Sequence, residues 1–529
     1  MARRATKQVK EPTLESRLWA AADVLRNAVE AAEYKHIVLN LFFLRFASEK
    51  FEEQRRKLIA DGKERYVEIK EFYTKDNVFF VPDGEPYSAR WSKIKANAKQ
   101  ADIAIRIDKA LEMLEAENPE LVGALPSGYF VRLELETSKL GSLVDEIGNI
   151  TLPDDEQDII GRVYEYYLTQ FALKEGKGKG EFYTPKTIVK LIVEMIEPFS
   201  GKVYDPCCGS GGMFVQSVDF VSHHQGTSRD ISIYGQEYTA TTYRLAKMNL
   251  AIRGISANLG AAPRNTFSAD QHKDLKADFI MANPPFNQKK WRAENELVDD
   301  PRWDGYKVPP TSNANYGWIL HIASKLSQDG VAGFLLANGA LSESGTEQLI
   351  RKQLIENDLV EAIAILPRNL FYTTDISVTL WILNRNKKAR FYRTPGGEMR
   401  RLRDRTGQVL FLDLRQKGVP FEKKYVELSD AERAEIVGTY HAWQSPNWET
   451  EYEDVPEYCY SATKDEIASK DYTLVPSRYI EFASQDEAVD YDERMRELQG
   501  ELADVLKQEE ETRAQVLKVF EELGYGIEL

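Results

Sequence analysis

Hydrophobic positions at helical spacing dominate the first third of the chain. After Pro12 and Thr13, a typical helix start, apolar residues recur every three or four positions, at Leu14, Leu18, Ala21, Leu25 and Val29. The run from Ile37 to Phe46 is hydrophobic nearly all round, which is typical of a helix buried on several sides. It is too short to span a membrane. We therefore predict an N-terminal helical bundle over residues 1–155.

The pattern changes after a segment of glycines and lysines, Lys174 to Gly180 (KEGKGKG), which has no apolar face. We interpret this segment as a mobile loop, and a lid over a cofactor is a second interpretation. From Thr187 onward, helical patterns alternate with short β-rich runs, at 202–204, 231–234, 278–281, 332–336, 359–366 and 378–383. This alternation predicts an α/β fold with a mostly parallel sheet, over residues 156–480.

A basic segment follows between Lys387 and Gly407, before a strand-like run that ends at Arg415. It contains four closely spaced arginines, Arg400, Arg401, Arg403 and Arg405. We interpret the segment as a solvated hairpin. A phosphate-contacting edge is the alternative, because arginine is a common ligand of phosphate oxygens.

The chain closes with a charged helical pattern over residues 481–529. Its apolar positions repeat every three or four residues, at Leu498, Leu502, Val505, Val516, Val519 and Leu523. Such a stripe is typical of a helix that packs against a partner. We predict a C-terminal helical partner-binding segment, and packing back on its own domain is the second interpretation.

Composition limits the classes of protein that fit these patterns. A chain of 529 residues with 43% hydrophobic content exceeds one core and predicts two or three globular domains. The three cysteines, Cys207, Cys208 and Cys459, fit neither a disulfide framework nor a zinc site, so we expect reduced thiols. The sequence shows neither a signal peptide nor an apolar stretch of membrane-spanning length, so we expect a cytoplasmic protein.

The net charge of -15 bears on possible partners. Phosphate contacts require concentrated lysine and arginine, so this charge argues against a grip on nucleic acid over the whole surface. Any binding to DNA must be local or supplied by a partner.

The first chemical motif is Val203–Phe214 (VYDPCCGSGGMF), a strand-like run that ends in an acid and a glycine turn. Gly209 and Gly211 allow the backbone to approach a ligand closely, although an isolated glycine cluster is most often a structural turn. Asp205 disfavours a pyrophosphate and suits the ammonium group of a methionine. This combination favours S-adenosylmethionine over NAD.

A second acid, Glu237, ends the next strand-like run, Tyr234-Gly-Gln-Glu237. It lies one β-α unit beyond the glycine turn. Dinucleotide-binding folds place an acid at the corresponding position, where it accepts hydrogen bonds from both ribose hydroxyls. An isolated glutamate is more often a surface residue, and its place after the glycine turn is what favours a ribose contact.

The third motif, Asn283-Pro-Pro-Phe286, directly follows the strand-like run 278–282. An amino group conjugated to a nucleobase is a poor nucleophile, because its lone pair is delocalised into the ring. The Asn283 side-chain oxygen and the Pro284 carbonyl can each accept one amine hydrogen, which localises that pair without a metal or a covalent intermediate. Phe286 supplies a stacking face for a base turned out of the duplex, and a rigid loop is the structural alternative.

A fourth segment, Gly180–Ile188, precedes the others and contains Phe182, Tyr183, Thr184 and Pro185. Proline near the first turn predicts a helix that starts here. Phe182 or Tyr183 can face the cofactor adenine or its cationic sulfur. By itself the segment would be only a helix start.

In the order FYTP, DPCCGSGG, GQE, NPPF, these segments resemble the modification subunit of type I restriction-modification systems, a group of amino-methyltransferases acting on DNA adenine. The similarity extends to DIIGRVYEYYLTQF at 158–171, NYGWILH at 315–321, and the runs 366–372 and 380–384, and the N-terminal YKHIVLNLFFLRFASEKFEE resembles the family's helical domain. The resemblance implies a Rossmann-like, S-adenosylmethionine-dependent methyltransferase domain after an N-terminal helical bundle.

The resemblance also implies the residues of the site. Cofactor contacts are expected from Glu181, Phe182, Tyr183, Thr184, Pro185 and Lys186, from Gly209, Ser210 and Gly211, and from Glu237. The target adenine is expected to be held by Asn283, Pro284, Pro285 and Phe286. Where the family often has an acid before a Thr or Ser near the cofactor adenine, this chain has Asn265 before Thr266, and we expect Asn265 to bond the purine instead.

The family implies partners as well: DNA, a separate specificity subunit that serves two methylating subunits, and a restriction subunit in the larger complex. Base readout by the specificity subunit would account for the acidic charge of this chain. The aromatics of the segment 288–315, Trp291, Trp303 and Tyr306, either shape the target-base pocket or anchor the loop.

Three other functions stay open at this point. An Asn-Pro-Pro turn also serves the N4 amine of cytosine, although the motif order favours adenine. An RNA or protein-glutamine methyltransferase would more naturally lack the terminal helical segments. A non-catalytic DNA-clamping scaffold predicts a damaged site, whereas Asp205, Glu237 and Asn283–Phe286 are present.

Overall fold

A computed structural model describes residues 31–150, 165–166, 169, 184–371, 377–394, 396–421, 425–482 and 491–522. The chain divides into two compact units, Met1–Ile480 and Glu481–Leu529. The predicted first helix around 14–29 and the KEGKGKG loop lie outside the described residues. None of the described helices combines the length and apolar character that a membrane crossing needs.

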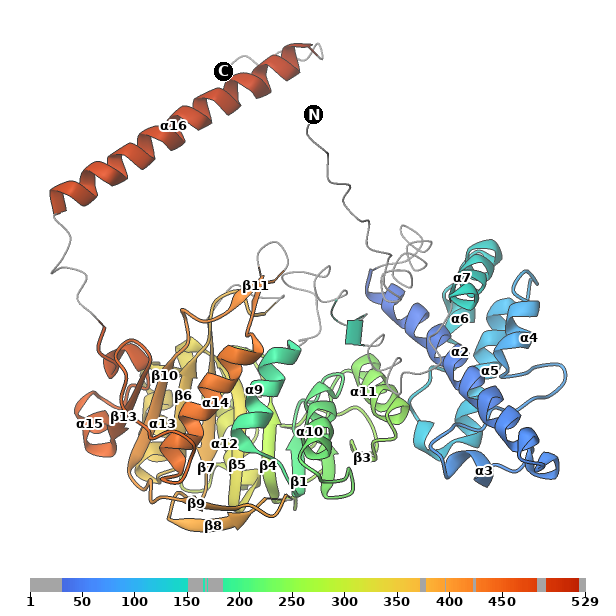
Figure 1. Cartoon of the computed structure of the whole chain (residues 1–529), viewed down its shortest axis with the longest axis horizontal. Coiled ribbons are helices and arrows are strands. Elements are labelled where there is room, and N and C mark those ends of the chain that lie inside the picture. The colour runs from blue at the N-terminus through green and yellow to red at the C-terminus, as the bar shows by residue number, and fades with distance from the viewer. Residues whose placement is uncertain are drawn as a thin grey trace, which may run out of the picture. The chain divides into compact units, whose positions relative to one another are not determined.

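The N-terminal part of the first unit is helical (Figure 1). Its longest helix, α2 (Ala31–Ala60), contains the apolar run from Ile37, and Ile37, Leu41 and Leu44 are completely buried, as predicted. The other elements are η2 (Glu64–Tyr66), α3 (Glu71–Thr74), α4 (Trp91–Ala96), α5 (Ile103–Glu117), η3 (Pro119–Leu121), α6 (Tyr129–Arg132) and α7 (Thr137–Asn149). They surround one hydrophobic core.

A nine-stranded sheet forms the centre of the remainder of this unit. Its strand order is β13-β10-β6-β7-β5-β4-β1-β2-β3. The strands are β1 (Gly201–Asp205), β2 (Ile231–Gly235), β3 (Ala257–Asn258), β4 (Ala277–Ala282), β5 (Leu326–Ala337), β6 (Val360–Ile365), β7 (Val378–Asn384), β10 (Gln408–Asp413) and β13 (Cys459–Thr463). β7 is antiparallel to both its neighbours and β13 is antiparallel to β10, while the other pairs are parallel. The predicted α/β fold with a mostly parallel sheet is confirmed.

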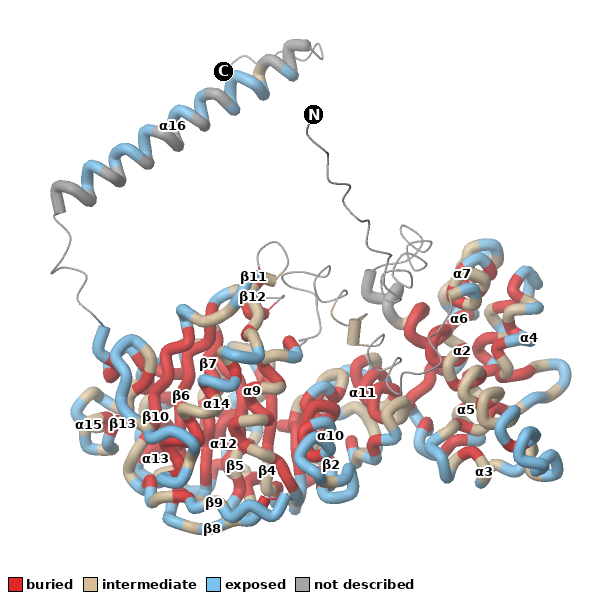
Figure 2. Tube along the Cα trace, in the orientation of Figure 1, coloured by how far each residue is buried: buried red, intermediate tan, exposed pale blue. Residues whose placement is uncertain are grey.

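Helices and two hydrophobic clusters complete the layers of the fold (Figures 1 and 2). One cluster unites β-strand residues with α9 (Lys186–Ile196), α10 (Gly212–His223) and α14 (Asp430–Gln444). The other unites them with α12 (Asn315–Lys325) and α13 (Thr346–Glu356). Both faces of the sheet are therefore covered, as a parallel sheet requires.

One helix, α11 (Ala240–Ile252), joins the helical part to the sheet part. Its Leu245 and Met248 belong to the core of the helical part, whereas Tyr243 and Leu250 belong to a core of the sheet. Lys247 Nζ also donates to the Val122 carbonyl oxygen at 2.7 Å. The two parts are consequently held together by apolar and polar contacts through α11.

The remaining elements are short: η4 (Pro301–Trp303), η5 (Asn338–Leu341), β8 (Arg390–Arg393), β9 (Met399–Leu402), β11 (Val419–Phe421), β12 (Tyr425–Glu427), α15 (Lys464–Ser469) and η6 (Pro476–Arg478). The second unit contains α16 (Tyr491–Glu522), a helix with several exposed apolar side chains. All three cysteines are free thiols, as expected.

The basic segment is a hairpin, since β8 and β9 pair antiparallel, but most of its arginines are not solvated. Arg405 is completely buried and pairs with Glu361 at 2.8 Å, Arg400 pairs with Glu197, and Arg403 Nε donates to a backbone carbonyl. Arg401 is exposed. The prediction of solvation was wrong because buried acceptors, contributed by distant parts of the chain, meet these guanidinium groups.

Candidate functional site

Three of the predicted motifs meet at one edge of the sheet. Asp205 is the last residue of β1, Glu237 and Asn283 follow the carboxyl ends of β2 and β4, and β1 pairs with both β2 and β4. The chain order reverses at β1, since β2 and β3 lie on one side and β4 and β5 on the other. In open α/β sheets, ligands bind at such a reversal, outside the carboxyl ends of the strands.

The glycine turn between β1 and α10 depends on left-handed backbone angles. Gly209 has φ +54° and Gly211, the N-cap residue of α10, has φ +81°, a region that side chains disfavour. Gly209 N donates to Glu237 Oε2 at 3.1 Å, and Glu237 Oε1 accepts from Thr239 N at 2.8 Å. The predicted glycine turn and the predicted ribose-binding acid are therefore in direct contact.

Asp205 lies beneath this turn and is only 2% exposed. Its Oδ1 accepts from Cys207 N at 2.9 Å. Burial raises the pKa of Asp205 to about 7, against the lowering effect of the Cys207 hydrogen bonds. The carboxyl group can thus gain or lose its proton near neutral pH, and a cation beside it would favour the charged form.

A series of polar contacts connects the glycine turn to α11 and α9. Asn249 Nδ2 donates to the Ser210 carbonyl oxygen at 2.8 Å, and Asn249 Oδ1 accepts from Arg253. Arg253 and Lys186 each reach Glu165 at 3.0 Å. Sequence reasoning included Glu165 only within the family-like run 158–171, and it missed Asn249 and Arg253.

Asn283 directly follows β4 and is 8% exposed. Its Nδ2 donates to Thr184 Oγ1 at 2.8 Å. Its Oδ1 is buried and has no hydrogen-bond partner among the described residues. The side chain therefore presents an unused acceptor, which is the group that an amine hydrogen requires.

Pro284 and Phe286 of the same motif lie next to Asn283 and differ in their exposure to solvent. Pro284 is buried, and Phe286 is partly exposed and packs edge to face against Phe371, with ring centroids 6.1 Å apart. A half-buried aromatic ring fixed by a second ring suits the stacking role predicted for Phe286.

The loop after Phe286 is fixed to α12. Asn287 N donates to Asn315 Oδ1 at 3.1 Å, and Asn315 Nδ2 returns a bond to Asn287 Oδ1 at 2.9 Å. Trp291 and Trp303 are buried, and each indole N–H donates to a backbone carbonyl. Of the two interpretations of these tryptophans, the structure supports loop anchors.

Asn265 caps a turn with its side chain. Its Oδ1 accepts from Phe267 N at 2.8 Å and from Ser268 N at 3.2 Å. The expected hydrogen bond from a purine amine would therefore have to go to the same Oδ1 that already accepts from Phe267 N and Ser268 N.

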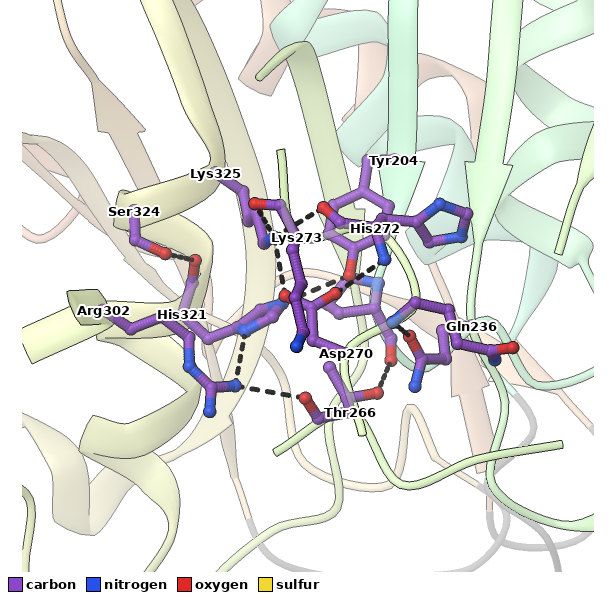
Figure 3. Close-up of polar contacts among 12 residues, drawn as sticks. Tyr204, Gln236, Thr266, Asp270, His272, Lys273, Arg302, His321, Ser324 and Lys325 are labelled. Atoms are coloured by element: carbon purple, nitrogen blue, oxygen red, sulfur yellow. Dashed lines mark hydrogen bonds and ion pairs between the residues drawn. The ribbon is translucent and has the colours of Figure 1, made fainter. Parts of the chain in front are cut away.

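Arg302 fixes the same turn from η4. It donates to the carbonyl oxygen of Thr266 at 3.1 Å (Figure 3) and to that of Phe267 at 2.7 Å. Arg302 also contacts His321 Nδ1, and His321 Nε2 lies 3.2 Å from the Tyr204 hydroxyl. Burial lowers the pKa of His321 to about 3, so the ring is neutral and acts within a fixed network. Sequence reasoning included His321 only within the family-like run 315–321, and it missed Arg302.

The fourth predicted segment is described only in part. Glu181, Phe182 and Tyr183 lie outside the described residues. Pro185 is buried and precedes α9, as predicted from its position, and Lys186 pairs with Glu165. Thr184 contacts Asn283 and so brings the first and the last of the four motifs together.

Known families account for most of the chain. The model of the family described as N-6 DNA Methylase matches residues 155–488, which is more than half of the sequence. The chain belongs to this family. The HsdM N-terminal domain model matches residues 14–147 of this methylase, within the part predicted to be a helical bundle.

The relatives of this methylase are methylase subunits of type I restriction enzymes. The HindI methylase subunit of Haemophilus influenzae is 41% identical over 464 residues, covering 83% of this chain and 100% of the relative. The MjaIX methylase subunit of Methanocaldococcus jannaschii is 33% identical and covers 97% of this chain and 92% of the relative. The similarity thus spans nearly the full length of both relatives.

Solved structures agree in fold. The type I restriction-modification methyltransferase subunit of Streptococcus thermophilus has a TM-score of 0.71 and 23% identity, and covers 88% of this chain and 99% of its own. A structure described as the basis of assembly and conformational transition of the type I R-M system has a TM-score of 0.58 and 18% identity, with 96% and 99% coverage. The predicted fold class, a methyltransferase domain after a helical one, is confirmed.

Proposed function

We propose that this methylase transfers a methyl group from S-adenosylmethionine to the N6 amine of adenine in DNA, as the modification subunit of a type I restriction-modification complex. The observation that carries the proposal is the buried Oδ1 of Asn283 at the carboxyl end of β4, which has no hydrogen-bond partner in the described part of the chain. An acceptor at this position can form a hydrogen bond with one amine hydrogen, which localises the lone pair on the nitrogen. The Pro284 carbonyl is proposed to accept the other hydrogen.

The residues of the glycine turn fit this cofactor. Positive φ angles at Gly209 and Gly211 keep the turn tight. A Cβ atom at Gly212 would meet nothing within 4 Å, so the backbone there borders open space that a ligand can enter. Asp205 is proposed to pair with the ammonium group and Glu237 to accept from the ribose hydroxyls. When bound, S-adenosylmethionine supplies the electrophilic methyl group.

The carboxyl groups of Glu237 and Asp205 differ in their hydrogen bonding before the cofactor binds. Glu237 already accepts two backbone N–H groups, and a carboxylate oxygen can accept more than one hydrogen bond, which is what a ribose contact requires. Asp205 accepts a hydrogen bond from Cys207 N and is buried, so an ammonium group would compensate its charge. The remaining proposed contacts, Glu181 to Lys186 and Asn265, would surround the rest of the cofactor.

Partners are proposed from the family. The relatives are subunits of restriction enzymes, so we expect a specificity subunit that reads DNA, two methylating chains for each specificity subunit, and a restriction subunit. We propose domain limits of 1–155 and 156–480, with 481–529 as the partner-binding segment. Exposed Leu502, Leu506, Val516 and Val519 on α16 support a docking role for that segment.

The test is co-expression of this chain with its specificity subunit in a methylation-free host, followed by mass spectrometry of the DNA nucleosides. We expect N6-methyladenine, and its loss in Asn283→Ala. Asn295→Ala, an exposed asparagine in the loop that follows, is the matched control and should leave the modification intact. N4-methylcytosine would change the target base. Neither product, from a complex that binds DNA and cofactor, would favour the scaffold or another substrate.

A further inference from the structure

The orientation of the Asn283 carboxamide decides whether the site can hold an amine. A carboxamide has an acceptor oxygen on one side and a donor nitrogen on the other, and the two exchange when the group rotates. With Oδ1 toward the substrate, the side chain accepts an amine hydrogen. With Nδ2 toward the substrate, the N–H groups of Asn283 would face the N–H groups of the amine, and no hydrogen bond could form. A residue that holds the carboxamide in place therefore contributes to the reaction without touching the base.

Thr184 is in the position to do this. Its Oγ1 accepts from Asn283 Nδ2 at 2.8 Å, across 99 positions of sequence, while the opposite atom, Oδ1, is buried without a partner among the described residues. The carboxamide is therefore anchored on its nitrogen side and open on its oxygen side.

The support behind Thr184 is rigid. The next residue, Pro185, is buried and leads into α9, whose Ile188, Leu191 and Ile192 are completely buried. Lys186 pairs with Glu165 at 3.0 Å. Because proline fixes its own backbone and α9 is packed against the sheet, the Thr184 hydroxyl has a defined position relative to β4.

We propose that Thr184 is a positioning residue for methyl transfer, which anchors the Asn283 carboxamide with Oδ1 toward the target amine. The inference rests on the proposed function and adds a role for Thr184 other than contact with the cofactor. Thr184 acts through Asn283 and contacts neither the base nor the transferred methyl group.

The test uses Thr184→Val and Thr184→Ser in the reconstituted complex with the specificity subunit. Valine keeps the shape and removes the hydrogen bond, which leaves the buried Nδ2 unsatisfied, so we expect the single-turnover methylation rate to fall about 10- to 100-fold. Serine keeps the hydroxyl and should retain a rate within about threefold of the wild type. The rate is measured at saturating S-adenosylmethionine, so that any change in cofactor affinity at Thr184 does not account for its loss. The dissociation constant for DNA should change little in both variants, and the melting temperatures should confirm folding.

A double-mutant cycle with Asn283→Ala separates the possible roles. If Thr184 acts through Asn283, Thr184→Val should cause no further loss in the Asn283→Ala background. Additive losses would overturn the inference, as would a loss in Thr184→Val that comes entirely from weaker cofactor binding. A wild-type rate in Asn283→Ala would instead overturn the proposed function. A full rate in Thr184→Val, with Asn283→Ala inactive, would overturn only the positioning role.

Discussion

At the scale of single residues, the protonation of Asp205 links cofactor binding to pH. Burial raises the pKa of this carboxyl group to about 7, so the cofactor-free protein holds it partly protonated at neutral pH. A cationic ammonium group binds the charged form. Affinity should therefore be weak below this pKa and should rise as the carboxyl group loses its proton.

We accordingly expect the affinity for S-adenosylmethionine to increase about tenfold between about pH 6 and about pH 7.5. Isothermal titration calorimetry at several pH values would measure it, and binding near neutral pH should release protons from Asp205. Asp205→Asn, which cannot titrate, should bind more weakly and lose this dependence. An affinity that is constant over this range in the wild type would contradict the role of Asp205.

At the scale of elements, α11 supports the cofactor turn through a relay of polar contacts. Arg253 is 8% exposed at its side chain and connects Glu165 to Asn249, which holds the Ser210 carbonyl oxygen. Elements that are distant in sequence thus share one hydrogen-bonded path. Loss of Arg253 removes one donor from Asn249 Oδ1 and one from Glu165, which weakens the path to the turn.

Arg253→Met should weaken binding of S-adenosylmethionine about tenfold, because the Ser210 turn loses its support. Arg244→Met on the same helix removes an exposed arginine and is the matched control. Equilibrium dialysis of the full chain with labelled cofactor would compare the two. Equal affinities in both variants would show that the relay does not position the turn.

A second charged group that connects distant elements is the ion pair between Glu361 of β6 and Arg405, and both side chains are completely buried. Asn384 and Gln444 also donate to Glu361. Arg405→Met would leave a buried carboxylate without its cation, so we expect a loss of about 3–5 kcal/mol in the free energy of unfolding. The exposed Arg401→Met should change it by less than about 0.5 kcal/mol. Urea denaturation followed by tryptophan fluorescence would measure both values, and similar stabilities would be inconsistent with this account.

At the scale of the whole molecule, the net charge of -15 favours the proposal that a partner reads the DNA. Leu502 and Leu506 of α16 are 58% and 53% exposed, and they lie one helical turn apart. Exposed leucines on one side of a long helix favour packing against another helix. The proposed partner is the specificity subunit.

We expect the double variant Leu502→Glu and Leu506→Glu to retain cofactor binding and to lose co-purification with the specificity subunit. Ala503→Glu places the same charge at an exposed position on another side of the helix and should preserve the complex. Size-exclusion chromatography of co-expressed subunits would distinguish the variants. Intact complex in the double variant would exclude this stripe as the docking surface.

The sequence by itself determined the alternation of strand-like and helical runs, the glycine turn after β1, and the acids and the Asn-Pro-Pro-Phe motif at the ends of strand-like runs. These features are local, since short apolar runs, glycines and prolines fix backbone conformation within a few residues. The order of the strands within the sheet, which brings Asp205, Glu237 and Asn283 to one edge, came from the tertiary structure.

Only the tertiary structure decided which side chains meet across long separations. Thr184 bonds Asn283, Arg253 bonds Glu165, and Arg405 is buried against Glu361 rather than solvated. A hydrogen bond between distant residues leaves no periodic pattern in a sequence, because it depends on how whole elements pack. The motifs therefore determine which chemistry is available, whereas packing decides how each reactive group is oriented.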